Sequence, residues 1–197
     1  MRQNNKDIEL GKFISLILRH SPQTIDITLD EHGWANVDDL IRGINKKGKR
    51  IDFQDLERIV RENNKQRYSF NDDRTKIRAN QGHSIEVDVE LEEKVPPKYL
   101  YHGTSTRFID SIMNLGIQKQ NRQYVHLSKD FQTAFSVGKR HGKPTVLKID
   151  CIRMYDEGYK FYFSKNGVWL TDVVPVKFIS IEDNKNVKDM LSLKKEQ

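Results

Sequence analysis

Apolar residues recur at helical spacing in three stretches of the first half of the chain. The first predicted helix runs from Lys6 to about His20, because Pro22 cannot continue it. A second is predicted over residues 38–45, and a third from a cap at Asp52 to the pair Asn63-Asn64. The inner faces of the first and third helices consist of Leu10, Phe13, Ile14, Ile17, Leu18, Phe53, Leu56, Ile59 and Val60.

Shorter apolar stretches predict strands around these helices. A turn and short strand are expected at residues 33–36, and a hairpin between residues 67–70 and 75–79. Three helices followed by a hairpin are typical of a winged helix. Residues 85–91 alternate between apolar and charged and predict a half-exposed strand. Glu92-Glu93-Lys94 and Pro96-Pro97 then mark a linker, so we place the two domains at residues 1–92 and 93–197.

The second half of the chain reads as many short strands with only two helices. One helix is expected after a cap at Ser105 or Thr106 and ends at Gly116, and the other is capped by Ser128. The expected strands are 99–101, 124–128, 145–151, 159–163, 168–170 and 174–181, with Asn166-Gly167 closing a hairpin. This pattern indicates an α+β domain with a split, mostly antiparallel sheet. Because it contains neither GxGxxG nor a P-loop, a nucleotide here would be held in a non-Rossmann way.

Composition narrows the class of protein. The 197 residues contain 34 Lys and Arg against 28 Asp and Glu, which gives a net charge of +6. That excess favours a polyanionic partner, although solubility alone would also explain it. Cys151 is the single cysteine, so an internal disulfide framework and a cysteine-based zinc site are excluded. No run approaches the roughly 18 apolar residues that span a bilayer, and no signal peptide is evident, so we expect a cytoplasmic monomer without membrane contact.

The polar residues that suggest chemistry gather between Tyr99 and Ser128. A short aromatic strand is followed by His102-Gly103-Thr104, where Gly103 allows a close backbone approach. After the next helix comes Arg122, and then a strand on which His126 and Ser128 lie on one face.

This arrangement, YHGT followed after a helix by RQYVHLS, resembles the RNA 2′-phosphotransferase (Tpt1/KptA) family. The other matching segments are LRH ending at His20, KQRY ending at Tyr68, IRANQGHS ending at Ser84 and VWLT ending at Thr171. Five segments in the family's order cover nearly the whole chain.

The resemblance implies a winged-helix lobe that binds RNA, residues 1–92, and an ADP-ribosyltransferase-like domain that binds NAD, residues 93–197. It also implies the reaction of tRNA splicing in which an internal RNA 2′-phosphate attacks the ribose of NAD⁺ and expels nicotinamide. The ADP-ribosylated phosphate then breaks down to 2′-hydroxyl RNA and ADP-ribose 1″,2″-cyclic phosphate. NAD is consumed as a co-substrate, the partner is RNA bearing a 2′-phosphate, and no metal is implied.

The resemblance also assigns site residues. A phosphate monoester needs several fixed cations, and arginine offers bidentate geometry. The catalytic set is Arg19, His20, Arg67 and Arg122. The cofactor-binding set is His102, Gly103, Thr104, Ser128 and Arg140, and the RNA-binding set is Arg78, Asn80, Gln81 and His83. From the residues alone, Arg19 and His20 could simply complement a helix dipole, and Arg140 could belong to a solvated basic loop.

Two other functions fit the sequence. One is an ADP-ribosyltransferase that stops after the first step and caps terminal phosphates of nucleic acids. The other is a winged-helix DNA-binding regulator, but the acids Asp55, Glu57 and Glu62 on its recognition helix argue against that function. Protein-modifying ADP-ribosyltransferases usually carry an acid on a third strand. Here Asp172 is the one acid near the corresponding stretch, which suits a nucleophile that is already an anion.

Overall fold

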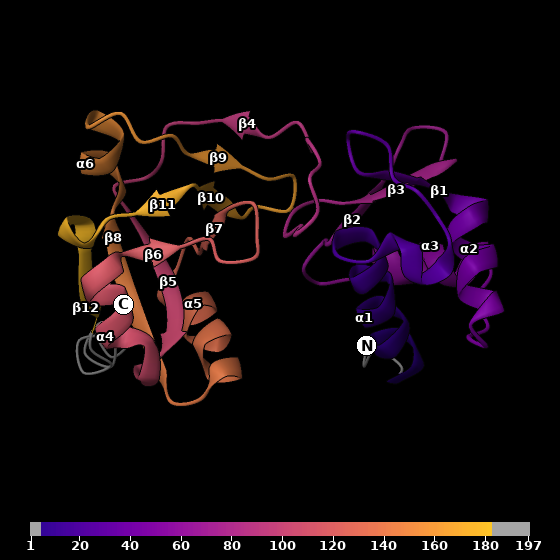
Figure 1. The fold of residues 1–197 in the computed structure, drawn as a ribbon, viewed down its shortest axis with the longest axis horizontal. Helices are drawn as coiled ribbons and strands as arrows, with labels where there is room; N and C mark the ends of the chain where they lie inside the picture. The colour runs from indigo at the N-terminus through magenta and orange to yellow at the C-terminus, as the bar shows by residue number, and fades with distance from the viewer. Residues whose placement is uncertain (1–4, 183–197) are drawn as a thin grey trace, which may run out of the picture. The chain divides into compact units, whose positions relative to one another are not determined.

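The computed structural model describes residues 5–182, which form two compact units (Figure 1). The first unit consists of the described residues up to Leu91 together with two later segments, Asn121–Gln123 and Ser164–Asn166. The second unit consists of Glu92–Gln120, Tyr124–Phe163 and the described residues from Gly167 onward. Each unit combines helices with small antiparallel sheets, so the α+β prediction is confirmed at that level.

The first unit contains three α-helices and one three-stranded sheet. Its elements are α1 (Asn5–Arg19), η1 (Pro22–Ile25), β1 (Trp34–Asn36), α2 (Val37–Lys46), α3 (Phe53–Arg61), β2 (Tyr68–Phe70) and β3 (Lys76–Ala79). The strand order is β1-β3-β2, and both pairings are antiparallel. The three predicted helices and the predicted hairpin are therefore confirmed, as is the cap at Asp52, which accepts a hydrogen bond from the Asp55 amide.

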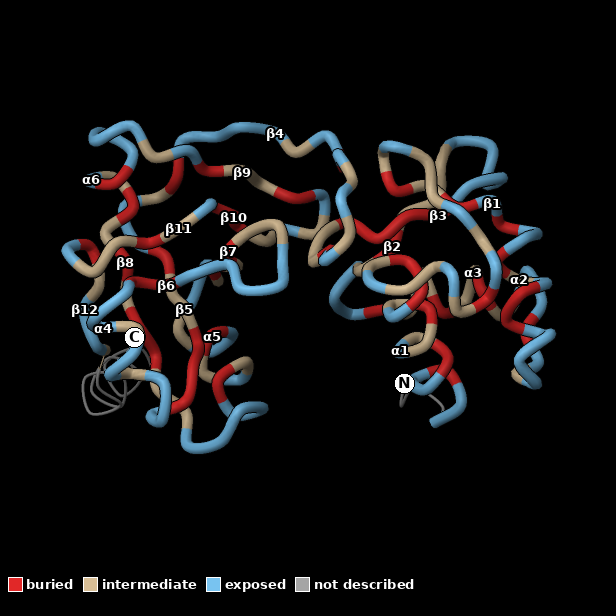
Figure 2. Tube along the Cα trace, in the orientation of Figure 1, coloured by how far each residue is buried: buried red, intermediate tan, exposed pale blue. Residues whose placement is uncertain are grey.

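The core of the first unit follows the predicted apolar stripes. Ile14, Ile17 and Leu18 of α1 are completely buried, together with Leu40 and Ile44 of α2. Figure 2 shows this buried side of the helices in red. Because α1 is fixed along its length by this packing, its last residue, Arg19, has a defined position.

The strand predicted over residues 85–91 is absent, and the chain there is irregular. Glu90 has a φ of 55°, which is incompatible with an extended ladder. The segment is instead attached to the loop before β1, since the Asp88 amide donates to the Glu31 carbonyl at 2.8 Å. Glu92–Glu93, expected in the linker, forms the short strand β4. Alternation of charged and apolar residues was therefore a misleading signal at this place.

The second unit contains three small sheets. Its elements are β4 (Glu92–Glu93), β5 (Tyr99–Ser105), η2 (Thr106–Phe108), α4 (Ile109–Leu115), β6 (Ile117–Gln118), β7 (Val125–Leu127), α5 (Phe131–Gly138), η3 (Lys139–His141), β8 (Pro144–Asp150), α6 (Cys151–Asp156), β9 (Tyr162–Phe163), β10 (Trp169–Thr171), β11 (Val173–Val174), η4 (Val176–Phe178) and β12 (Ile179–Glu182). The strand orders are β4-β9-β10-β7, β11-β6 and β12-β8-β5. The predicted hairpin across Asn166-Gly167 is present as β9 and β10.

Several details of the second unit differ from the predictions. β5 does not end at His102 but continues to Ser105, whose side chain makes no capping bond. Asp130, not Ser128, caps α5 by accepting from the Thr133 amide at 2.8 Å. Short polar side chains near a helix start compete for the cap, and sequence alone does not decide between them.

Two further predictions about strands were right only in part, since β8 ends one residue before Cys151 and the last strand is interrupted. Cys151 begins α6, a helix that the apolar run had concealed, because Asp150 accepts from the Arg153 amide and starts a helical turn. The last predicted strand is divided into β11, η4 and β12, with the break at Pro175, which lacks the amide that a ladder needs. No helix among residues 5–182 has the length and apolar character required to cross a membrane.

Candidate active site

The carboxyl end of α1 presents Arg19 and His20. The amides of His20 and Ser21 both donate to the Leu16 carbonyl, at 3.0 and 2.9 Å, so the helix closes there. Pro22 then starts the 3₁₀ turn η1 and prevents a further α-helical turn. The two predicted catalytic residues therefore lie at the end of a rigid helix whose inner face is buried.

Arg19 is a cation with two donor atoms that lack partners in the described part of the chain. Its Nε and Nη2 atoms are buried and have no hydrogen-bond partner among the described residues. The pKa of Arg19 is lowered to about 10, mainly by burial and also by the charges of Arg67 and Arg122, against an opposing effect of Tyr68. The guanidinium is still protonated at neutral pH. An unpaired buried cation is unfavourable in the protein alone, so this group is suited to an anionic ligand.

Arg67 is held close to Arg19 by a turn after α3. The Asn63 Oδ1 atom accepts from Arg67 Nη1 at 3.1 Å and from the amides of Lys65 and Arg67. Asn63 is only 5% exposed, so this amide forms a fixed support for the guanidinium.

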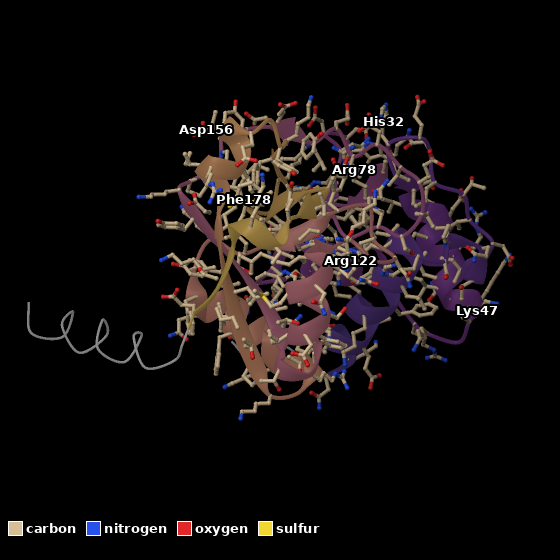
Figure 3. All side chains as sticks on the ribbon, turned by 60° about the vertical axis from the view of Figure 1, so that its left-hand side comes forward. His32, Lys47, Arg78, Arg122, Asp156 and Phe178 are labelled. Atoms are coloured by element: carbon tan, nitrogen blue, oxygen red, sulfur yellow. The ribbon has the colours of Figure 1, made fainter. Side chains whose placement is uncertain are left out.

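Arg122 joins the same unit from a distant part of the sequence, in the segment Asn121–Gln123 (labelled in Figure 3). The Gln123 amide donates to the His83 carbonyl at 3.1 Å, and Gln123 Nε2 donates to the Val87 carbonyl at 2.8 Å. The charge of Arg122 lowers the pKa values of both Arg19 and His20. The four residues predicted to be catalytic are thus brought together within the first unit.

His20 is oriented by Ser84. The Nδ1 atom of His20 lies 2.8 Å from Ser84 Oγ, and the Ser84 amide donates to the Arg19 carbonyl at 3.0 Å. Burial lowers the pKa of His20, and the charges of Arg19 and Arg122 lower it further, so the imidazole is mostly neutral at pH 7.

The side chains predicted to contact RNA lie mostly in the interior of the first unit. Arg78, Asn80 and His83 are 2%, 5% and 1% exposed, whereas Gln81 is partly exposed. Arg78 donates to Glu90, and Asn80 bonds Ser69 and the Gln66 carbonyl. Arg78 and Asn80 therefore fix the backbone around the site, and RNA contact by this segment stays a prediction.

His83 resembles Arg19 in that its buried nitrogen atoms lack hydrogen-bond partners in the described part of the chain. Neither ring nitrogen has a hydrogen-bond partner among residues 5–182. Burial lowers its pKa to about 4, and the charges of Arg19, His20 and Arg78 contribute. Gly82, directly before it, lies against Arg19, because a Cβ built on Gly82 would be 3.6 Å from Arg19 Cζ.

The residues predicted to bind the cofactor lie in the second unit. Backbone bonds of 2.9 and 2.7 Å join Tyr101 to Ser128, so His102 on β5 and Ser128 after β7 lie at neighbouring positions. The His102 ring is fixed by a 3.1 Å bond between Nδ1 and the His126 carbonyl. Thr104 is buried, and Arg140 is exposed in η3. The structure thus brings His102 and Ser128 together at adjoining strands.

Packing against α5 is enough to explain why a glycine stands at position 103. A Cβ at this position would fall 1.7 Å from the Ala134 carbonyl oxygen of α5. A Cβ on Gly138 would fall 2.6 Å from the Thr104 carbonyl oxygen. Gly103 therefore allows α5 to pack closely against β5, and contact of Gly103 with a cofactor stays a prediction.

Three supporting residues were not singled out from the sequence, namely Asn63, Ser84 and Gln123. Their polar side chains look like ordinary loop residues, and only the fold shows what they hold. No group of three or more His, Cys, Asp or Glu residues suited to a metal ion is found in the described part of the chain.

The comparisons with known proteins agree with one another. Residues 5–173 match the family model described as "RNA 2'-phosphotransferase, Tpt1 / KptA family". A protein of Fusobacterium nucleatum subsp. nucleatum named "Probable RNA 2'-phosphotransferase" is 60% identical over 176 residues, which is 89% of this chain and 98% of the relative. Proteins with the same name from Flavobacterium johnsoniae and Pectobacterium carotovorum subsp. carotovorum are 51% and 50% identical, covering 88% and 89% of this chain and 95% of each relative.

Proposed function

Because the chain belongs to the RNA 2′-phosphotransferase (Tpt1/KptA) family, we propose that it removes an internal 2′-phosphate from RNA with NAD⁺ as co-substrate. The products would be 2′-hydroxyl RNA, nicotinamide and ADP-ribose 1″,2″-cyclic phosphate, formed by way of an ADP-ribosylated phosphate.

The observation that carries this proposal is the state of Arg19. Two of its nitrogen atoms are buried without a partner from residues 5–182, beside two further arginines whose charges act on Arg19. A dianionic phosphate has three acceptor oxygens and would satisfy these donors with charge-assisted bonds. A neutral ligand would leave the repulsion between the arginines uncompensated.

His20 has a separate role in the proposal. With Nδ1 engaged by Ser84, the Nε2 atom on the opposite side of the ring is the one available to a substrate. A mostly neutral imidazole can exchange a proton with a phosphate oxygen or with the departing ribose 2′-oxygen.

In the second unit we propose that His102 and Ser128 hold NAD⁺ and that Arg140 meets its phosphates. Bound NAD⁺ supplies an electrophilic ribose carbon once nicotinamide leaves. The fixed His102 ring and its neighbour Ser128 fit such a ligand, because both are polar, adjacent and anchored to backbone. Their task would be to keep the ribose still while the phosphate oxygen is aligned.

We also propose that the first unit is a winged-helix lobe and that the second has the ADP-ribosyltransferase type of fold, with the lobes at residues 1–92 and 93–197. The three helices followed by the β2–β3 hairpin, and the small antiparallel sheets of the second unit, support this assignment.

Product analysis tests the function. The protein is incubated with NAD⁺ and an oligonucleotide that carries one internal 2′-phosphate, and in parallel with one that carries only a 5′-phosphate. We expect 2′-hydroxyl RNA and a cyclic phosphate of ADP-ribose from the first. A stable ADP-ribosylated end on the second, with no reaction at the 2′-phosphate, would favour the capping enzyme, and no consumption of NAD⁺ with either RNA would refute the proposal.

A further inference from the structure

The side chains that bond Arg67 and His20 are themselves uncharged. Arg67 is held by the amide of Asn63, and His20 by the hydroxyl of Ser84. The backbone next to Arg122 is held by Gln123, whose backbone amide donates to the His83 carbonyl and whose side-chain amide donates to the Val87 carbonyl. No ion pair of Arg19 or Arg67 with an acid is found among residues 5–182.

This pattern matters because the cations repel one another. Positive charges gathered in a partly buried place need other groups to keep them there when no substrate is bound. A carboxylate would do so most strongly, but it would also neutralise the arginine and compete with a phosphate. An amide or hydroxyl oxygen accepts the same hydrogen bond and leaves the charge available.

Two other arginines of the first unit, Arg58 and Arg78, are held by carboxylates. Arg58 makes hydrogen-bonded ion pairs with Asp7 at 3.0 Å and with Asp55 at 2.6 Å. Arg78 pairs with Glu90 at 2.9 Å. The same unit thus uses carboxylates for these two arginines and a neutral amide for Arg67.

We propose that Asn63, Ser84 and Gln123 are positioning residues whose lack of charge is itself required. Asn63 and Ser84 bond the side chains of Arg67 and His20, and Gln123 holds the backbone next to Arg122, so that the positive charge of Arg67 is left for the substrate phosphate. This inference rests on the function proposed above, and it assigns a role to residues that would position the site without themselves bonding the phosphate.

Asn63 gives the sharpest test, because aspartate is nearly its isostere. The Asn63 Oδ1 atom accepts three hydrogen bonds, and a carboxylate in Asn63→Asp would accept all three. The variant should therefore fold with an unchanged or higher melting temperature, while Arg67 becomes paired. We expect the KM for a 2′-phosphorylated oligonucleotide and the Kd for inorganic phosphate to rise about 10- to 100-fold.

Asn36→Asp is the matched control. Asn36 caps α2 by accepting from the Asp39 amide at 3.0 Å, a place where aspartate serves equally well. The control adds the same negative charge to the same unit and should leave KM and phosphate affinity within about twofold of the wild type.

Gln123→Met tests the second support. Methionine keeps the length of glutamine but cannot donate to the Val87 carbonyl. We expect about a tenfold loss of kcat/KM. The control Gln118→Met removes a similar side-chain bond, to the Leu115 carbonyl in the second unit, and should not share this loss.

The phosphate measurement separates this inference from the proposed reaction. If the wild type shows no NAD⁺-dependent turnover, but Asn63→Asp weakens phosphate binding and Asn36→Asp does not, the reaction is wrong and the positioning role holds. If Asn63→Asp binds phosphate and turns over as the wild type does, or if the wild type binds no phosphate, the positioning role is overturned.

Discussion

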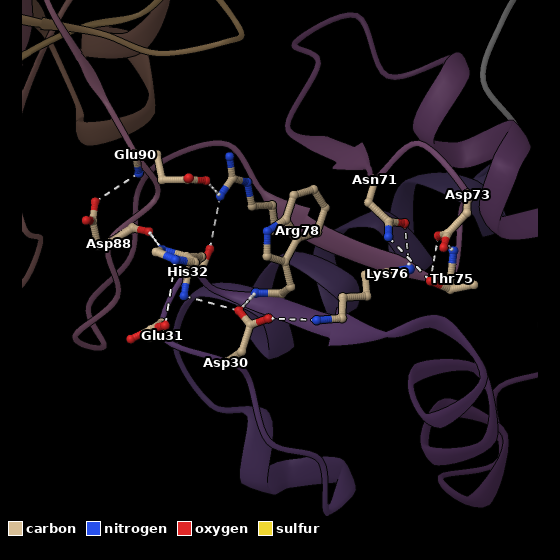
Figure 4. A network of polar contacts seen from close by, with 11 residues as sticks. Asp30, Glu31, His32, Asn71, Asp73, Thr75, Lys76, Arg78, Asp88 and Glu90 are labelled. Atoms are coloured by element: carbon tan, nitrogen blue, oxygen red, sulfur yellow. Dashed lines mark hydrogen bonds and ion pairs between the residues drawn. The ribbon is translucent and has the colours of Figure 1, made fainter.

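Two groups in the first unit contain the same residue types, an arginine with a histidine, in opposite environments. In the first, Arg78 lies over the Trp34 ring at 4.4 Å and donates to Glu90 at 2.9 Å and to the His32 carbonyl at 3.3 Å (Figure 4). His32 in turn bonds the Asp88 carbonyl. That bond raises the pKa of His32, and the carboxylates of Glu90, Glu31 and Asp88 add to the effect.

The second group consists of Arg19 and His83, whose buried nitrogen atoms have no partners among the described residues. Here the pKa of each group is lowered, first by burial and then by neighbouring positive charges. The comparison teaches that burial alone does not identify a functional arginine. Arg78 is satisfied by the protein and contributes to stability, whereas two nitrogen atoms of Arg19 have no acceptor within residues 5–182, and in the proposed function the substrate phosphate would supply it.

The largest expected effect separates the two arginines by activity. Arg19→Leu should lower kcat/KM for a 2′-phosphorylated oligonucleotide about 100-fold, because it removes charge-assisted bonds to the phosphate. Its free energy of unfolding should stay the same or rise, since a buried unpaired charge is replaced by an apolar group. Turnover and urea unfolding of one preparation measure both quantities. Wild-type turnover in this variant would remove Arg19 from the site.

Arg78→Leu should give the reverse result. The substitution removes the contact with Trp34 and the bonds to Glu90 and the His32 carbonyl, so the free energy of unfolding should fall by about 2–3 kcal/mol. Turnover of the folded protein should stay within about threefold of the wild type. A large loss of RNA affinity in a well-folded Arg78→Leu protein would instead support the predicted RNA contact and break the comparison.

The pH dependence of stability should also distinguish the two groups, because His83 is buried in its neutral form. Its pKa is about 4 in the folded chain and 6.5 without the fold, so between these values the unfolded chain binds the extra proton. Stability should therefore be full above about pH 6.5 and decrease as the pH falls toward 4, by about 2 kcal/mol at pH 5. His83→Gln should flatten this part of the profile measured by urea unfolding. An equal slope in both proteins would mean that His83 is not held neutral by the fold.

The sequence predicted the part of the fold that depends on local pattern. The stripe from Leu10 to Leu18, the Asp52 cap and the hairpin before Ala79 were read from periodicity and turn chemistry, and all are present. The error at residues 85–91 came from a tertiary bond to the Glu31 carbonyl, which overrode the local pattern. The error at Cys151 came from a local helix cap, in which Asp150 accepts from the Arg153 amide, that the apolar run concealed.

The site residues could be predicted only within the sequence segments that match the RNA 2′-phosphotransferase family. Those segments named Arg19, His20, Arg67 and Arg122 but gave no sign that a segment at residues 121–123 would join the first unit. They also could not show that Arg78 is paired while Arg19 is not, because pairing depends on where Glu90 lies in space. Physical roles of single arginines therefore had to come from the structure.

The smallest expected effect is the increase in the free energy of unfolding when phosphate binds. A ligand that binds only the folded state stabilises it by RT ln(1 + [L]/Kd), which is about 1 kcal/mol at a phosphate concentration five times Kd. Because the ligand would satisfy Arg19, this gain should appear in the wild type and in Arg78→Leu but not in Arg19→Leu. For a chain of this size the melting temperature would rise by about 2–4 °C.

Chloride at the same ionic strength is the control, since general screening would act on all three proteins alike. An equal rise in Arg19→Leu would show that phosphate binds elsewhere. The unpartnered nitrogen atoms of Arg19 would then need an explanation other than a ligand, and the distinction between the two arginine–histidine groups would rest on stability alone.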